Sequence, residues 1–103
     1  MKYLILEKVV FQSIQDFEDI IELLKINQIK AWVNCPRRMY KFYQEVQKQI
    51  GNGEQIIYTI RGGNWEMGCN SIHFIDLISF ISGETDFSIT SSDLDTKILK
   101  KKF

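Results

Sequence analysis

Two short apolar runs lie on either side of one amphipathic segment in residues 3–34, YLILEKVVFQSIQDFEDIIELLKINQIKAWVN. The first run, Tyr3–Leu6, ends at a charged pair, as buried parallel strands often do. Ser13 precedes apolar residues that recur at helical spacing, so we expect it to cap a helix over residues 14–26. Residues 29–34 predict a second strand. Together the three segments predict a β-α-β unit with parallel strands.

The remainder of the chain continues the alternation of helices and strands. Pro36 suits the first turn of a helix that ends at Gly51, because its missing amide donor is not needed there. Residues 55–60 predict a third strand, and residues 67–82 predict a third helix that a glycine closes. The last segment, 86–103, predicts one or two strands. The order β-α-β-α-β-α-β indicates an α/β or α+β fold, in which helices pack against a small mixed sheet.

The composition is that of an ordinary globular chain. Its 103 residues and 12.1 kDa suit one compact unit with a single core. Thirteen basic residues balance thirteen acidic ones, so we expect neither nucleic acid nor a membrane as a partner. No apolar run approaches the ~20 residues that cross a bilayer, and no export signal is recognisable. We therefore expect a cytoplasmic protein in which Cys35 and Cys69 are reduced thiols.

The third helix carries a cluster of reactive side chains. Cys69, His73 and Asp76 are spaced by four and three residues, which places them on one helical face. The only histidine is the natural group for proton transfer near neutral pH, and a carboxylate one turn away can orient its ring. A structural hydrogen-bonded pair is the alternative. A metal-dependent hydrolase is a further alternative, although no additional histidine or paired cysteine completes a metal site.

Two charged pairs and one tryptophan are the other candidates. Glu7 and Lys8 end the first strand, and α/β folds bind ligands at the carboxyl edge of parallel strands. Arg37 and Arg38 stand at the start of a helix, where they are either solvated surface arginines or, because they oppose the helix dipole, partners of a carboxylate or a ligand anion. Trp65 is either a core aromatic residue or the wall of a sugar-sized pocket.

Three ordered segments carry a resemblance to a known family. They are Leu6–Val9 (LEKV), Val33–Tyr40 (VNCPRRMY) and Gly62–Asp76 (GGNWEMGCNSIHFID). In their order and spacing they resemble the Gfo/Idh/MocA family of NAD(P)-dependent oxidoreductases. That family has a Glu-Lys-Pro segment, an arginine-rich strand end, and a Gly-Gly turn that leads into an Asp-x-x-x-His-x-x-Asp helix. Here Val9 replaces the proline and Cys69 replaces the first aspartate.

The resemblance implies a role for each matching residue. Lys8 corresponds to the lysine near the nicotinamide and the substrate, and His73 to the histidine that exchanges a proton with the substrate hydroxyl. Substrate contacts are implied for Asn70, Asp76, Arg38 and Trp65, and contacts with the cofactor for Glu7 and Lys8. The implied reaction is hydride transfer at a hydroxyl or carbonyl of a sugar-derived molecule or polyol, with NAD or NADP as the cofactor. No metal site is implied.

One expected motif is absent from the sequence. No Gly-x-Gly-x-x-Gly follows any predicted strand, so we expect this chain alone to bind no NAD or NADP and to be inactive by itself. By the resemblance, residues 1–36 are the last β-α-β unit of a dinucleotide-binding domain, and residues 37–103 begin a substrate and oligomerisation domain. The alternative is a non-catalytic module for oligomerisation or partner binding. In either case exposed sheet surface favours a homo-oligomer, with a dimer formed through the sheet.

Overall fold

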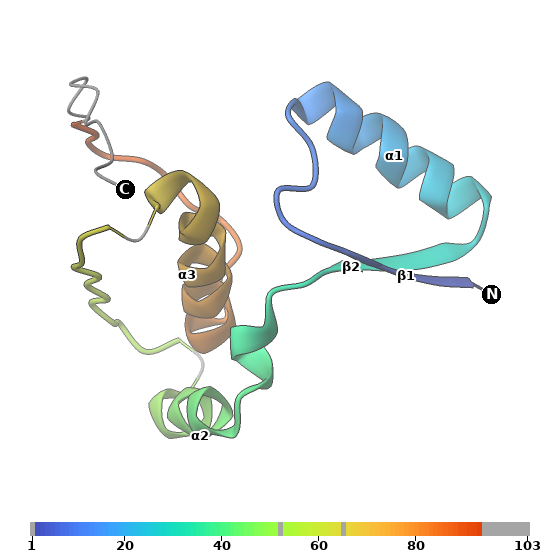
Figure 1. The fold of residues 1–103 in the computed structure, drawn as a ribbon. Helices are drawn as coiled ribbons and strands as arrows, with labels where there is room; N and C mark the ends of the chain where they lie inside the picture. The colour runs from blue at the N-terminus through green and yellow to red at the C-terminus, as the bar shows by residue number, and fades with distance from the viewer. Residues whose placement is uncertain (1, 52, 65, 94–103) are drawn as a thin grey trace.

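The protein has an α+β structure with a small parallel sheet (Figure 1). The computed structural model describes residues 2–51, 53–64 and 66–93. Across those ranges it contains three α-helices, one 3-10 turn and two strands. In chain order the elements are β1 (Lys2–Leu6), α1 (Ile14–Ile26), β2 (Ile29–Val33), η1 (Pro36–Met39), α2 (Lys41–Ile50) and α3 (Met67–Ser82).

The predicted β-α-β unit is present. Strands β1 and β2 pair in parallel with Lys2 opposite Ile29 and Leu6 opposite Val33. The predicted cap forms, because the Ser13 hydroxyl accepts a hydrogen bond of 3.1 Å from the backbone N–H of Asp16. Helix α1 lies on one side of the two strands (Figure 1). Its residues line a hollow together with Leu6 of β1 and Ala31, Trp32 and Val33 of β2.

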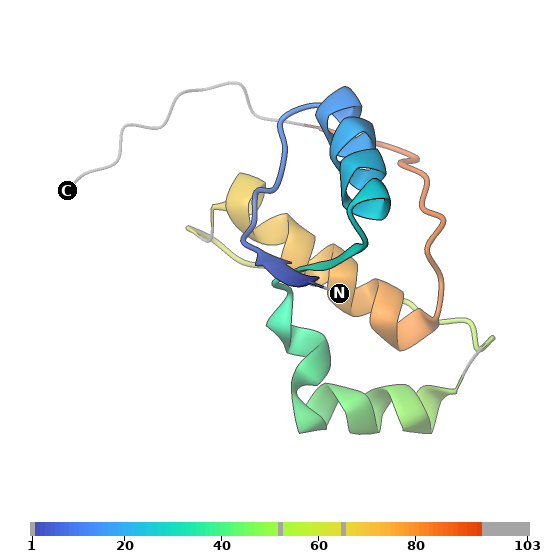
Figure 2. The same ribbon diagram turned by 90° about the vertical axis from the view of Figure 1, so that its right-hand side faces the viewer.

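The second group of elements is η1, α2 and α3, which pack against one another (Figure 2). Helix α3 spans the residues predicted for it and ends at Gly83, whose φ of 74° gives the left-handed conformation of a helix cap. Among the described residues only two side chains are fully buried, Leu77 and Ile81, and both lie on α3. The core of the protein is therefore small and belongs to this second group.

The sheet differs from the prediction in size and type. It has two parallel strands and is not mixed, because residues 55–60 form no strand in the structure. A strand needs a hydrogen-bonded neighbour, and this segment pairs with neither β1 nor β2. Residues 86–93 form no strand either, and the rest of the predicted C-terminal strands, 94–103, lies outside the described residues.

Two residues just before α3 have unusual backbone angles. Positive φ angles occur at Asn64 (56°) and Glu66 (49°). Asparagine tolerates the left-handed region because its short polar side chain can bond locally, whereas glutamate does so less readily. The residues with left-handed backbone angles therefore lie after the two glycines, next to the first turn of α3.

Candidate active site

A cleft of about 440 Å³ lies between the two groups of elements. Its walls come from the loop after β1, from α1, from the end of β2 and from the first half of α3, and the lining residues are Val9, Val10, Phe11, Phe17, Val33, Cys35, Gly68, Ile72 and Asp76. The carboxyl ends of both parallel strands meet at this cleft, which is where open α/β sheets bind their ligands. Its walls are mostly apolar, and Asp76 supplies the one carboxylate among them.

Lys8 joins the two groups of elements at the rim of the cleft. Its ammonium group donates a hydrogen bond of 2.8 Å to the backbone carbonyl of Cys69, in the first turn of α3. The side chain is half-buried, and the peptide bond from Lys8 to Val9 is cis. The hydrogen bond to Cys69 holds the lysine predicted to be catalytic against the helix that carries the predicted histidine.

Glu7 is held by a different neighbour. The Asn34 side-chain amide donates a hydrogen bond of 2.6 Å to the Glu7 carboxylate, and the Asn34 backbone N–H donates one of 2.8 Å to the carbonyl of Leu6. Each residue directly follows its strand. This pair fixes the carboxyl ends of β1 and β2 to each other beside the cleft. Asn34 was not among the predicted site residues, although its place at the end of a parallel strand was a usable signal.

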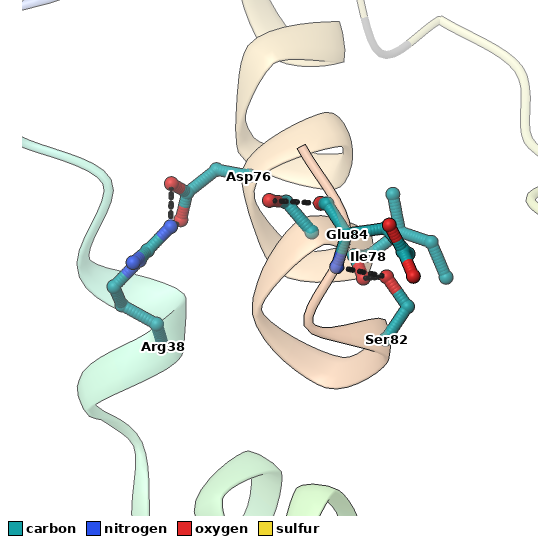
Figure 3. A network of polar contacts seen from close by, with 6 residues as sticks. Arg38, Asp76, Ile78, Ser82 and Glu84 are labelled. Atoms are coloured by element: carbon teal, nitrogen blue, oxygen red, sulfur yellow. Dashed lines mark hydrogen bonds and ion pairs between the residues drawn. The ribbon is translucent and has the colours of Figure 1, made fainter. Parts of the chain in front are cut away.

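Arg38 and Asp76 form an ion pair between η1 and α3 (Figure 3). The Arg38 Nε–H donates to one carboxylate oxygen at 2.9 Å, and a terminal NH₂ group donates to the other. The Arg38 side chain is 42% exposed and that of Asp76 17% exposed. The hydrogen bond that Arg38 donates to the Asp76 carboxylate raises the pKa of Arg38 above its already high ordinary value. Of the alternatives that the sequence left open, the carboxylate partner is present for Arg38, and it is Asp76.

Aromatic rings of α3 support the same arginines. The Arg37 guanidinium lies 4.1 Å from the centroid of the Phe74 ring, and that of Arg38 lies 5.7 Å from the centroid of Phe80. Such cation–π contacts add to the charge pair because the face of an aromatic ring attracts cations. Arg38 and Asp76, both predicted to bind substrate, thus satisfy each other and orient η1 against the helix.

His73 lies on a different stripe of α3 from the residues that line the cleft. It is one turn from Leu77 and two turns from Ile81, which are the buried residues of the helix. Its Nδ1 atom is buried and has no hydrogen-bond partner within the described part of the chain. The Asp76 carboxylate, which the sequence suggested as its orienting group, is bound to Arg38 instead.

The remaining predicted residues are placed as follows. The Asn70 side chain donates to the carbonyl of Glu66 at 3.4 Å and is half-buried. Trp65 lies outside the described residues. Cys69, His73 and Asp76 do not gather into a group that could hold a metal ion, and no other three ligating side chains do so in the ranges described. Both cysteines are free thiols.

Cys35 lines the cleft and was not named as a site residue. Burial raises the pKa of its thiol above the ordinary 9.0, the nearby Asp76 carboxylate acts in the same direction, and Arg38 opposes them. We expect alkylation of Cys35 by iodoacetamide to be slow at pH 7.5 and to accelerate only as the pH rises above 9.0, because the thiolate is the reactive form. Mass spectrometry of the labelled peptides measures this rate.

The exposed Cys69 is the internal reference for that measurement. In the folded protein it should label faster than Cys35 at pH 7.5, and in urea the two rates should converge because unfolding removes the burial that protects Cys35. Equal rates in the folded protein would contradict the assignment of Cys35 to a shielded wall of the cleft.

Comparison of the chain with protein-family models, with curated proteins and with solved structures gave no match. The geometry of the cleft, and the residues that carry the resemblance described from the sequence, are therefore the basis for any functional proposal. Across the part of the chain that the structure describes, no helix combines the length and hydropathy needed to cross a bilayer.

Proposed function

We propose that this chain supplies the substrate side of an NAD(P)-dependent oxidoreductase site that acts at a hydroxyl or carbonyl group of a sugar-type molecule. The observation that carries the proposal is the hydrogen bond from Lys8 to Cys69. It brings the carboxyl end of β1, where the resemblance places one reacting group, to the helix of His73, where it places the other. A cleft of about 440 Å³ at this point is within the usual size of small-molecule sites.

The side chains at the cleft have complementary tasks in this proposal. The Lys8 ammonium group can donate to a substrate oxygen and stabilise negative charge that develops on it. An imidazole can take or give the proton of a substrate hydroxyl near neutral pH. When bound, NAD or NADP supplies the chemistry of hydride acceptance or donation. A substrate that fills the cleft displaces water from its apolar walls, which strengthens the polar contacts made there.

His73 requires a change of position to take part. Its ring lies on the stripe next to Ile72, which lines the cleft, and its Nδ1 lacks a partner in the described structure. A buried polar atom without a hydrogen bond costs about 1–3 kcal/mol. A turn of the ring toward a substrate hydroxyl in the cleft relieves this cost. In the proposed reaction, substrate binding and the placement of His73 therefore occur together.

The longer β-α-β-α-β-α-β order and the division at residue 36 belong to the same proposal. Residues 55–60 keep the composition of a strand, with isoleucines at three of six positions, and Ile57 is 94% exposed. Such a segment forms a strand once a neighbouring edge offers hydrogen bonds. In the proposed enzyme it extends the sheet of the substrate domain.

Replacing Lys8 by methionine tests the site directly. Glucose, sorbitol and inositol, titrated into the ¹⁵N-labelled chain, are expected to shift the amide resonances of cleft residues, with affinities in the millimolar range. Lys8→Met is expected to weaken this binding about tenfold or more, because a hydrogen bond from a charged donor is worth about 1.5–3 kcal/mol. The matched control is Lys41→Met, at an exposed lysine on α2, which should bind as the unaltered chain does.

Dinucleotides provide the second arm of the experiment. NAD⁺, NADH and NADP⁺ titrated by calorimetry should give no heat of binding at micromolar concentrations, because the chain has no Gly-x-Gly-x-x-Gly turn. Micromolar affinity for any of them would show that the chain provides more than the substrate side. The proposal fails if none of the three sugars shifts a cleft resonance, or if Lys8→Met and Lys41→Met bind equally well.

A further inference from the structure

The two groups of elements are joined by few connections. Within the described residues the chain passes once from the first group (β1, α1 and β2) to the second (η1, α2 and α3), between β2 and η1 (Figure 1). In the same residues no helix or strand of the first group lies against one of the second. Among the hydrogen bonds between described residues, the one from Lys8 to the Cys69 carbonyl crosses from group to group. Groups joined in this way can move as rigid bodies about their connection.

The connection narrows to a single residue, Cys35. Asn34 belongs to the first group, because its backbone N–H donates to the carbonyl of Leu6 and its side chain donates to Glu7. Pro36 is already the first residue of η1. Cys35 between them has a φ of −114° and a ψ of 81°, whereas a residue before proline commonly has a ψ of about 120–160°. Rotation of Cys35 toward those angles is sterically allowed, and it turns one group relative to the other.

Open space borders the same residue. Cys35 lines the cleft of about 440 Å³, and it also lines a hollow of about 390 Å³ whose other walls come from the strands and from η1. In a close-packed interior a backbone rotation drives side chains into one another. The fully buried side chains of the described ranges, Leu77 and Ile81, both lie on α3 and away from this connection. Close packing therefore does not hold Cys35 in one conformation.

We propose that Cys35 is a hinge about which the two groups open and close, and that the hydrogen bond from Lys8 to Cys69 is the latch that keeps the cleft closed. The two parts of this device lie at the same cleft, since Cys35 lines it and the Lys8 bond spans its rim. The donor is an ammonium group, and hydrogen bonds from charged donors are stronger than neutral ones. Loss of this one bond leaves the covalent connection at Cys35 as the main restraint. The device controls access to the cleft, and it does not depend on which molecule binds there.

Distances between spin labels test the hinge. Glu22→Cys on α1 and Gln49→Cys on α2, both exposed, provide the labelling sites in the full chain, and Cys35→Ser and Cys69→Ser remove the native thiols. The latch stays intact in this background, because Cys69 accepts through its backbone carbonyl. Double electron–electron resonance should then give one dominant distance. Lys8→Met should raise the ratio of open to closed molecules about tenfold or more, because a hydrogen bond from a charged donor shifts an equilibrium by that factor. The open molecules appear as a second distance.

A second pair of labels separates hinge motion from loss of folding. Gln49→Cys on α2 and Ile75→Cys on α3 both lie within the second group, whose helices pack against each other. Their distance should remain single when Lys8 is replaced. Lys41→Met, at an exposed lysine on α2, is the matched control and should leave both pairs of distances unchanged.

A substitution at Cys35 tests the position of the hinge. Cys35→Gly in place of Cys35→Ser should broaden the Glu22–Gln49 distances, because glycine has a wider range of backbone angles than serine. The proposal is overturned if Lys8→Met or Cys35→Gly leaves these distances unchanged, or if Lys41→Met changes them as much as Lys8→Met does. It is also overturned if the pair within the second group spreads as widely as the pair across the cleft.

Discussion

Leu77→Ala is expected to lower the free energy of unfolding by about 2–5 kcal/mol, the usual cost of truncating a fully buried leucine. Leu77 has no exposed surface, and only Ile81 approaches it in burial within the described ranges. Both residues lie on the stripe of α3 that also carries His73. A cavity at Leu77 therefore removes packing at the most buried point among the described residues.

Urea unfolding followed by far-ultraviolet circular dichroism measures this effect. Ile75→Ala is the matched control, because Ile75 lies on the same helix but is 49% exposed. Its loss should cost less than about 1.5 kcal/mol, since less surface returns to water and no closed cavity forms. If the two variants unfold at the same urea concentration, Leu77 is not the centre of the core.

The second large effect is expected at the ion pair between Arg38 and Asp76. Arg38→Gln and Asp76→Asn should each lower the free energy of unfolding by about 1–3 kcal/mol. We expect the lower part of this range for Arg38→Gln, because the Arg38 side chain is 42% exposed and water screens its charge. Each single substitution removes a bidentate contact and leaves its partner without a counter-charge.

A double-mutant cycle resolves the contribution of the pair. The double variant should cost little more than either single one, which corresponds to a coupling energy of about 1 kcal/mol or more. Arg61→Gln, at an exposed arginine, is the control and should change stability by less than about 0.5 kcal/mol. Additive effects of Arg38→Gln and Asp76→Asn would show that the two side chains act independently.

Local signals predicted α1, α3 and the parallel pair of strands, whereas the single helix predicted from Pro36 to Gly51 is divided at Tyr40 into η1 and α2. Ser13 and Gly83 mark one end each of α1 and α3, and the structure uses both as caps. The β-α-β unit followed from two apolar runs and one amphipathic segment, all within 34 residues, and it is present as predicted. These features depend on neighbours in the chain, which a single sequence displays.

Features that depend on distant partners were less predictable. Residues 55–60 have the composition of a strand, but the pairing that makes a strand comes from elsewhere in space, and the structure contains no such pairing. Helical spacing placed His73 and Asp76 on one face and suggested that they interact. The structure shows that Asp76 pairs with Arg38, which lies 38 residues away. Spacing along a helix identifies which side chains are neighbours, but it does not decide which of them bond.

The hydrogen bond from Lys8 to Cys69 has a consequence for the order in which the protein folds. It spans 61 residues, whereas the Glu7–Asn34 pair spans 27 and the Arg38–Asp76 pair 38. The entropy lost on closing a loop grows with the logarithm of its length, and one hydrogen bond returns only about 0.5–1.5 kcal/mol. Once the two shorter loops have closed, they hold Lys8 and Cys69 closer together. The entropy lost on forming the Lys8–Cys69 hydrogen bond is then smaller. We therefore expect the Lys8–Cys69 contact at the cleft to form after the two shorter closures and to be lost before them.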